Sequence, residues 1–208
     1  MASLAELLSR HPAHLWVGAR GRFVGPRLAT GHAPLDALLD GGWPTGTLIE
    51  LLADGPGLSR LSLILPALAA LTREGRTLAW LHAGTTPYAP ALLQAGVDLS
   101  RVLILDATEH RERLWAAEHC LQGGGALVME ESQRIADPLL RRLKLAAAGS
   151  GAVLFLLRPS SAAAIPSPAA LRIQLSARPY ARTRQLSLIK GGGGIPRMLS
   201  LDLHAAGH

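Results

Sequence analysis

The sequence predicts an α/β protein with a mainly parallel sheet that is flanked by helices on both faces. Five short apolar runs carry this prediction, at residues 47–52, 77–82, 101–105, 126–129 and 152–157. These runs are continuous instead of alternating, which is typical of strands that are buried on both faces. Helical segments separate them, and strands that alternate with helices favour parallel pairing.

The expected helices follow from apolar spacing and from signals at their ends. Four helices are predicted between the runs, at residues 61–73, 88–95, 110–121 and 139–147. Pro66 is expected to kink or restart the first of them, and Gly96 is a typical residue just past the end of the second. A further short amphipathic helix is expected around Leu35, Leu38 and Leu39.

The pattern changes after Arg158. Residues 159–168 are rich in serine, alanine and proline and are predicted as a loop. Three strand-like segments follow, at residues 171–175, 185–189 and 198–203. The last two alternate apolar and polar residues, so antiparallel C-terminal strands with one face in water are expected.

The N-terminal residues predict a short helix and a linker ahead of one domain. Ser3 is a suitable N-cap for a helix over 3–10, with Glu6 in the capping-box position. Residues 1–29 are therefore read as an N-terminal helix and linker, and residues 30–208 as a single domain without internal repeats.

Composition sets limits on the class of protein. The chain has 208 residues, of which 49% are hydrophobic and 17% are charged, with a formal net charge of +6. This composition is globular, and the positive charge permits contact with nucleic acid or with an acidic protein. A single cysteine, Cys120, excludes an internal disulfide. Because no secretory signal or membrane-length apolar run is present, a soluble cytoplasmic protein is expected.

The stretch from Thr30 to Leu65 is the most informative part of the chain. A predicted strand is followed by the glycine-containing segment 54–59 and then by a helix, which is the order of a phosphate-binding loop. The complete fingerprint is G-x-x-x-x-G-K-[ST]. In this chain Leu58 stands in the lysine position and Ser59 in the hydroxyl position, so the loop lacks its main positive charge.

The same stretch resembles the ATP-binding core of RecA-type recombinases. The matching positions are Thr30-Gly31, Leu35-Asp36, Leu39, Gly41-Gly42, Pro44, Gly46, Glu50 and the segment 93–99. More specific matches, to the ImuA family of RecA-like proteins, are Gly41-Gly42-Trp43-Pro44, Pro87-Tyr88-Ala89-Pro90-Ala91-Leu92, Leu114–Glu118 and the segment 166–172. The resemblance covers residues 30–203.

The resemblance implies a RecA-like fold and a role in lesion bypass. ImuA-type proteins belong to a DNA-damage-inducible, SOS-type set of translesion synthesis proteins. The set includes an ImuB-type polymerase relative that acts as a hub and an error-prone DnaE-type polymerase. These two proteins, and RecA itself, are therefore the expected partners, with mutagenic DNA repair as the process.

Comparison with the RecA active site predicts that hydrolysis is lost. No carboxylate follows the second predicted strand, where RecA proteins carry a catalytic glutamate, and Arg158 replaces the glutamine that senses phosphate. Glu130 keeps the acidic position after the fourth strand, whereas Arg60 is expected to point away from the loop. No cofactor and no catalytic residue are predicted. A vestigial nucleotide site is the alternative, with the residues Gly55, Gly57, Ser59, Arg60 and Glu130.

The two connections that hold DNA in RecA proteins are short in this chain, so DNA binding in the manner of RecA is not expected. Direct DNA binding through other residues is an open alternative. Basic residues elsewhere could contact single-stranded DNA by charge, assisted by stacking on Tyr180. The candidates are Arg141, Arg142, Lys144, Arg182, Arg184, Lys190 and Arg197. A solvated basic surface explains the same residues without DNA.

The leading hypothesis is a non-catalytic accessory protein that acts by protein contact. Leu4, Leu7 and Leu8 on the N-terminal helix, and the C-terminal strands, are the predicted docking elements. A divergent DNA-dependent ATPase and a single-stranded-DNA-binding protein are the alternatives. A SulA-like division inhibitor is more distant.

Overall fold

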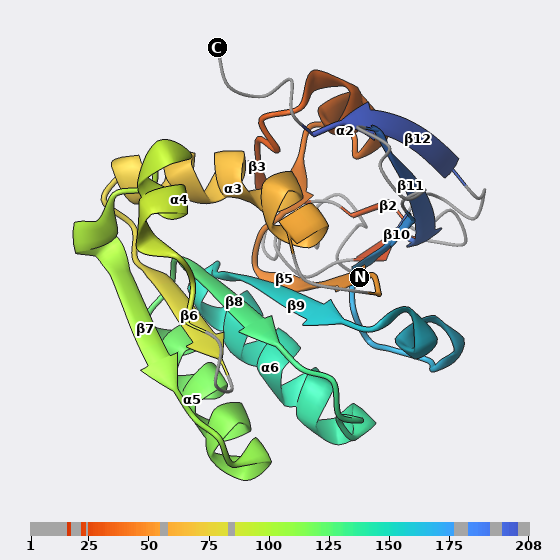
Figure 1. The fold of residues 1–208 in the computed structure, drawn as a ribbon. Helices are drawn as coiled ribbons and strands as arrows, with labels where there is room; N and C mark the ends of the chain where they lie inside the picture. Colours follow the sequence, from red (N-terminus) through yellow and green to blue (C-terminus); the bar gives the residue numbers. More distant parts are fainter. Residues whose placement is uncertain are drawn as a thin grey trace, which may run out of the picture.

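A computed structural model describes residues 16–17, 22–23, 25–54, 58–82, 86–176, 183–191 and 197–203, and for residues 16, 17, 22, 23, 58, 59 and 197 it describes the backbone alone. Eight strands form one sheet in the order β12-β11-β10-β5-β9-β8-β6-β7 (Figure 1). Their bounds are β5 Thr47–Leu52, β6 Leu78–His82, β7 Val102–Asp106, β8 Ala126–Glu130, β9 Val153–Arg158, β10 Leu171–Ser176, β11 Thr183–Lys190 and β12 Arg197–Asp202. Two-stranded pairs are formed by β1 (Trp16–Val17) with β2 (Arg22–Phe23) and by β3 (Arg27–Leu28) with β4 (Trp43–Pro44).

Helices connect the strands of the sheet. They are α2 Ala33–Leu38, α3 Leu58–Arg73, α4 Ala89–Gln94, α5 His110–Gln122 and α6 Asp137–Ser150, with 3-10 turns η1 Leu99–Arg101 and η2 Ser160–Ala164. The strands from β10 to β7 in the sheet order pair in parallel, and β11 runs antiparallel between β10 and β12. The predicted fold class is confirmed: the chain is α/β, and its architecture is consistent with a RecA-like core.

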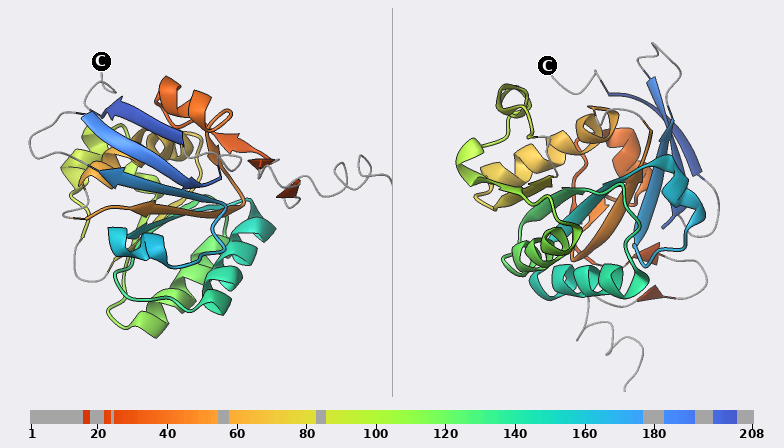
Figure 2. Two further views of the ribbon diagram at one scale, coloured as in Figure 1. Left: turned by 90° about the vertical axis from the view of Figure 1, so that its right-hand side faces the viewer. Right: turned by 60° about the horizontal axis from the view of Figure 1, so that its bottom comes forward.

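Helices lie on both faces of the sheet (Figure 2), and an apolar core lies on each face. On one face, Ile49, Phe155 and Trp80 pack with α2 and α3. On the other face, Leu48 and Leu154 pack with α5 and α6. Neighbouring residues of one strand point to opposite faces, so the continuous apolar runs of β5, β8 and β9 supply both cores at once.

Trp43 explains the glycine pair that precedes it. The indole is fully buried and meets Phe155 edge to face, with ring centroids 5.4 Å apart and an angle of 84° between the rings. Gly42 lies at a φ of +122°, and a β-carbon there would come within 2.3 Å of the Leu28 carbonyl oxygen. Only glycine fits this close approach, which lets the chain turn into β4 and bury Trp43.

Helix α3 corrects one expectation. It begins at Leu58, three positions before the predicted start at 61, and it continues through Pro66 without restarting. Proline removes one backbone hydrogen bond from a helix, but tertiary packing compensates. The neighbours Leu63, Ile64 and Ala67 are all fully buried in the core, and burial of this apolar face maintains the helix across the proline.

Strand β7 corrects a second expectation, because it is not covered on both faces. It lies at the edge of the sheet, and β6 is its only partner strand among the described residues. Leu103 and Ile104 are 48% and 41% exposed. Consecutive residues point to opposite faces, so neither core extends fully over this edge.

Among the described residues, no helix has both the length and the apolar character that crossing a membrane requires.

Candidate functional site

The carboxyl ends of β5, β8 and β9 meet around a small open cavity. Its volume is about 200 Å³, and its lining includes Ala53 and Asp54 after β5 and Glu130 at the end of β8. In open α/β sheets, ligands bind beyond the carboxyl ends of the strands. This cavity is therefore the candidate site, and it lies where the sequence predicts the vestigial phosphate loop.

Two of the predicted vestigial-site residues come together in this cavity. Arg60 and Glu130 both line it, and Arg60 Nη2 lies 3.0 Å from Glu130 Oε1. Gly55 and Gly57 lie outside the described residues, as does the side chain of Ser59. The structure thus joins the basic and the acidic member of the predicted set.

The orientation of Arg60 is set by contacts at the ends of two strands. Residues 55–57 of the loop lie outside the described part of the chain, so the expectation that Arg60 points away from the loop stays a prediction. The guanidinium turns toward the strand ends, where Nη1 donates a hydrogen bond of 3.0 Å to the carbonyl oxygen of Arg158. Helical side chains lean toward the helix N-terminus, and Arg60 lies in the first turn of α3. That lean brings the guanidinium back over β8 and β9 and leaves its side chain only 5% exposed.

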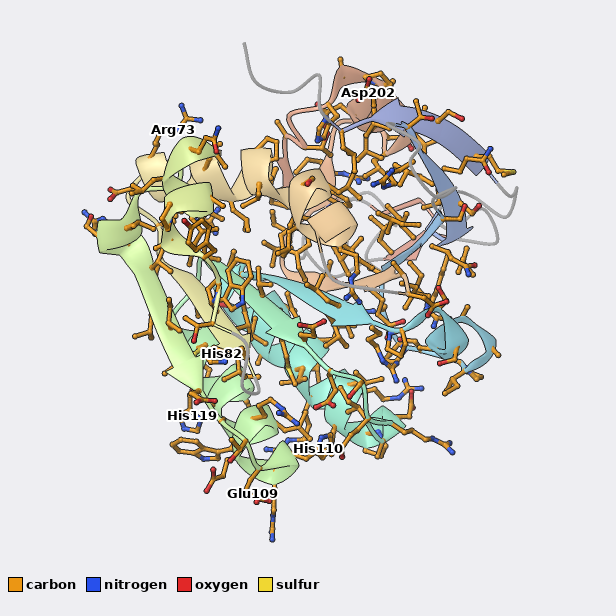
Figure 3. All side chains as sticks on the ribbon, in the orientation of Figure 1. Arg73, His82, Glu109, His110, His119 and Asp202 are labelled. Carbon is orange, nitrogen blue, oxygen red and sulfur yellow. The ribbon has the colours of Figure 1, made fainter. Side chains whose placement is uncertain are left out.

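The other acidic groups of the cavity already have partners. Asp54 Oδ1 accepts a hydrogen bond of 2.9 Å from the Ser160 backbone amide. Glu131 is buried, and its Oε2 lies 3.0 Å from His110 Nδ1 and 3.2 Å from Arg113 Nε. Figure 3 shows His110 in the first turn of α5. These contacts hold α5 against the end of β8 and already engage the carboxylate of Glu131.

His82 stands at the end of β6, beside the connection where RecA proteins carry their catalytic glutamate (Figure 3). Its Nδ1 atom lies 3.8 Å from Asp106 Oδ1. This separation is longer than a hydrogen bond, and the buried Nδ1 has no hydrogen-bond partner among the described residues. The carboxylate of Asp106 therefore does not orient the imidazole of His82 as it would in a catalytic general base. The described residues also contain no group of three or more histidine, cysteine or acidic side chains that could hold a metal ion.

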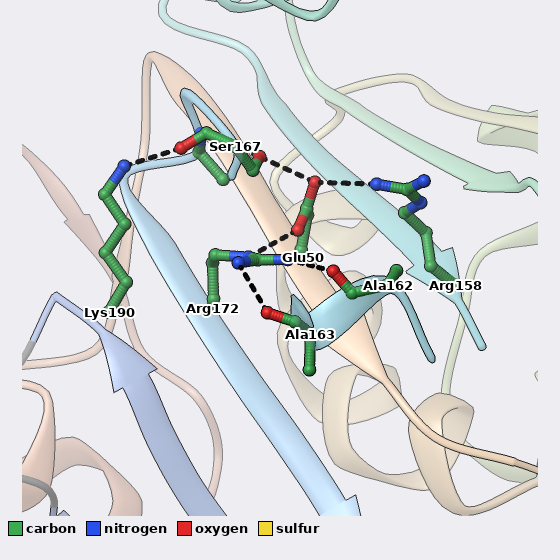
Figure 4. A network of polar contacts seen from close by, with 8 residues as sticks. Glu50, Arg158, Ala162, Ala163, Ser167, Arg172 and Lys190 are labelled. Carbon is green, nitrogen blue, oxygen red and sulfur yellow. Dashed lines mark hydrogen bonds and ion pairs between the residues drawn. The ribbon is translucent and has the colours of Figure 1, made fainter. Parts of the chain in front are cut away.

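A buried ionic network joins β5, β9 and β10 next to the cavity, and it was not predicted from the sequence (Figure 4). Glu50, in the middle of β5, is fully buried. Its Oε2 accepts a hydrogen bond of 2.6 Å from Arg172 Nε, and its Oε1 accepts bonds from Ser167 Oγ at 2.7 Å and from Arg158 Nη1 at 3.4 Å. One carboxylate thus compensates two buried guanidiniums. The only signal in the sequence is a charged residue in each of three largely apolar strands.

The network also fixes the connection between β9 and β10. Arg172 Nη2 donates to the Ala162 carbonyl oxygen at 2.7 Å, and Lys190 Nζ donates to the Ser167 carbonyl oxygen at 2.7 Å (Figure 4). Lys144 Nζ, from α6, donates to the Pro168 carbonyl oxygen at 3.1 Å. Three elements therefore hold residues 159–170 from different sides, in the position where RecA proteins carry a mobile DNA-binding loop.

The predicted DNA-binding residues of α6 are mostly engaged with other groups. Arg141 Nε lies 2.6 Å from Asp137 Oδ2, and Arg142 Nη2 lies 2.5 Å from Glu118 Oε2. Both arginines remain exposed, but Lys144 is half-buried against the 159–170 connection. Lys144 is therefore less accessible to a ligand than the two arginines.

Lys144 and Lys190 approach each other at the 159–170 connection. Burial lowers the pKa of both ammonium groups below the ordinary lysine value, and the positive charge of Lys144 lowers the pKa of Lys190 further. Arg141 and Arg172 act on Lys190 in the same direction, against the charge of Glu50. The structure thus gathers positive charge at one place, although it was predicted on separate elements.

The remaining predicted residues are less informative. Arg184 lies on β11 and is half-buried. Arg197 begins β12, but its side chain is outside the described part of the chain, and Arg182 is outside it altogether. The docking residues Leu4, Leu7 and Leu8 also lie outside the described residues.

No protein-family model matches the chain, and no curated protein is significantly similar to it in sequence. The ImuA assignment therefore stays a prediction that rests on the residues quoted above, and the cavity has to be interpreted from its own geometry.

Proposed function

We propose that this chain is a non-catalytic, RecA-like accessory protein of error-prone translesion DNA synthesis. It acts in the cytoplasm through protein contacts with an ImuB-type polymerase relative, within an assembly that contains a DnaE-type polymerase, and with RecA as a further partner. The fold supports this proposal because it is consistent with a RecA-like core, and the cavity supports it because its charged groups already have partners.

The observation that carries the proposal is the ion pair between Arg60 and Glu130. Phosphoryl transfer needs a cation placed on the phosphates and an acidic group placed on Mg²⁺. In this cavity the cation and the carboxylate bind each other at 3.0 Å, and Arg60 also binds the Arg158 carbonyl oxygen. A nucleotide would have to break both contacts before Arg60 could bind its phosphates or Glu130 could bind its Mg²⁺.

Equilibrium binding of Mg-ATP by calorimetry tests the loss of nucleotide chemistry. We expect no binding at millimolar nucleotide, and no ATP turnover with or without single-stranded DNA. Micromolar binding, together with turnover that Glu130→Gln abolishes, would support the divergent DNA-dependent ATPase instead.

Association with the partner tests the positive half of the proposal. We expect the purified chain to bind an ImuB-type protein in a pull-down without added nucleotide, and adding ATP should not change the amount bound. If neither an ImuB-type protein nor RecA is retained by the full chain, the accessory role is refuted.

Binding of single-stranded DNA is a second candidate, and the positive charge around Lys144 and Lys190 favours it. These ammonium groups have no carboxylate within hydrogen-bond distance among the described residues, and each uses one of its three donors on a backbone carbonyl. Binding that weakens steeply with salt, and whose salt dependence decreases in Lys144→Gln, would support this candidate. An unchanged salt dependence would exclude this cluster as the DNA contact.

A further inference from the structure

Helices α5 and α6 lie on the face of the sheet opposite α3 (Figure 2). Residues of these two helices line a groove that is separate from the cavity described above. It has a volume of about 370 Å³. Leu114, Leu139 and Leu143 contribute aliphatic surface to its lining, and Leu114 and Leu143 also pack into the core. The groove is therefore a largely apolar depression formed by α5 and α6.

The wall of the groove includes an exposed tryptophan with a fixed orientation. Trp115 is 63% exposed, although most large apolar residues of this chain are buried. Its ring stacks on His119, with centroids 4.1 Å apart, and His119 Nδ1 lies 2.9 Å from the Trp115 carbonyl oxygen. Exposed tryptophans next to apolar pockets commonly contribute a large share of binding energy at protein interfaces.

The rim of the groove carries more donors than acceptors. Arg142 pairs with Glu118 across the two helices at 2.5 Å. Arg111 also lines the groove, and the structure gives it no ion pair or hydrogen bond with any described residue. The rim therefore has two guanidiniums and an indole N–H for a single carboxylate, and charge complementarity requires a ligand that supplies acceptors.

We propose that this groove binds an acidic, apolar peptide segment of a protein partner. An aliphatic or aromatic side chain of the segment packs against Leu114 and Leu143 beside Trp115. Carboxylates of the segment bind Arg111 and the free donors of Arg142. This inference rests on the proposed function, because it gives a location to the protein contact on which that function depends.

Two other occupants fit the groove less well. Single-stranded nucleic acid needs a succession of stacking surfaces and a basic track. Among the described residues that line the groove, Trp115 alone is aromatic, and Glu118 places a negative charge there. A second copy of the same groove would bring Arg111 and Arg142 against like charges. An oligothymidine probe in the test below represents the first of these occupants.

Fluorescence anisotropy with the full chain tests the proposal. The probe is a short fluorescein-labelled peptide in which leucine and phenylalanine alternate with aspartate. Matched probes replace the aspartates by lysines or the apolar residues by serines, and an oligothymidine probe represents nucleic acid. We expect binding of the acidic, apolar peptide alone, and weaker binding when NaCl rises from about 0.05 M to about 0.5 M.

Variants assign the binding to the groove. We expect Trp115→Ala and Arg111→Glu each to weaken binding of the acidic, apolar peptide by about tenfold or more. Leu145→Ala and Arg101→Glu are matched controls, because Leu145 is 70% exposed, Arg101 is also exposed, and neither lines the groove. Both controls should bind like the unmodified chain.

Four outcomes would overturn the proposal. They are no binding of the acidic, apolar peptide at millimolar concentration, equal binding of the lysine peptide, equal affinity in Trp115→Ala, and Trp115-dependent binding of oligothymidine instead. Pull-down of an ImuB-type partner separates this inference from the proposed function. If Trp115→Ala retains the partner as well as the unmodified chain does, the groove is excluded while the accessory role stands; if the unmodified chain retains none, the accessory role itself fails.

Discussion

Arg60 and Glu130 are 70 positions apart in the chain, and their side chains meet at 3.0 Å beyond the carboxyl end of the sheet. The two partners differ in environment. Arg60 is almost fully buried, whereas the Glu130 side chain is 52% exposed. Removing one partner therefore has a different consequence from removing the other, since the remaining charge is left in protein in one case and in water in the other.

This asymmetry predicts the order of two variants. Glu130→Ala leaves the buried Arg60 guanidinium without its carboxylate and should lower the free energy of unfolding by about 1–3 kcal/mol. Arg60→Met keeps the aliphatic volume and leaves Glu130 in contact with water, so the loss should be smaller. Urea denaturation of both variants and of the double variant measures the order. A larger loss in Arg60→Met would show that the bond to the Arg158 carbonyl oxygen dominates.

Glu50 should be the most sensitive ionic position among the residues the structure describes. Glu50→Leu leaves Arg158 and Arg172 buried without their carboxylate, and breaking a buried pair in this way costs about 3–5 kcal/mol. Asp137→Asn is the matched control, because it removes a carboxylate from an exposed pair with Arg141 and should cost less than about 1 kcal/mol. Urea unfolding midpoints compare them, and equal effects would mean that the Glu50 network adds no stability.

His32 predicts how stability depends on acidity. Burial lowers the pKa of its imidazole below 6.5, although a hydrogen bond to the Ser62 backbone and the charge of Asp36 act in the opposite direction. The unfolded chain then binds more protons than the folded chain just below pH 6.5, so stability falls as the pH drops from 6.5 toward the folded pKa.

Replacing this imidazole tests the pH dependence. His32→Leu should remove that part of the acid sensitivity, so the difference in unfolding free energy between variant and unmodified chain should change below pH 6.5. Between pH 7 and pH 8 the difference should stay constant, which serves as the internal control. Thermal or urea unfolding over this pH range gives the profile, and parallel profiles at all pH values would contradict the assignment to His32.

The edge strand β7 predicts concentration-dependent self-association. Its outer backbone edge carries no strand within the described residues, and Leu103 and Ile104 are both partly exposed. Such edges pair with other chains unless a charge interrupts them. Leu103→Lys should reduce association measured by light scattering, with little change in unfolding midpoint. Leu145→Lys places the same charge on α6, and it should leave association unchanged.

Much of the fold could be predicted from the sequence, because each apolar run is long enough to fill a central strand. Runs such as 152–157 and helical repeats such as Leu114, Ala117 and Leu121 indicate buried faces directly. The exposure of β7 could not be predicted, because burial of an apolar strand depends on its place in the sheet order. Long-range pairing determines that order, and no local pattern encodes it.

The candidate site was harder to predict than the fold. Arg60 and Glu130 were recognised as positions, but their contact depends on the lean of a helical side chain across to another strand. The role of Glu50 needed three separate strands to be placed side by side before its partners Arg158 and Arg172 became apparent. Charged residues are informative in pairs, and pairs that are distant in sequence are known only from the tertiary structure.

Strand β5 has a consequence for synthesis of the chain. It lies between β9 and β10, and its buried Glu50 binds Arg158, which is 108 positions further along. At about 5–20 residues per second, a ribosome needs roughly 5–20 s to make that interval. During this time β5, an almost wholly apolar segment that is fully covered in the finished domain, has emerged before either neighbour. The nascent chain should therefore depend on a chaperone at this stage more than a chain whose central strands are made last.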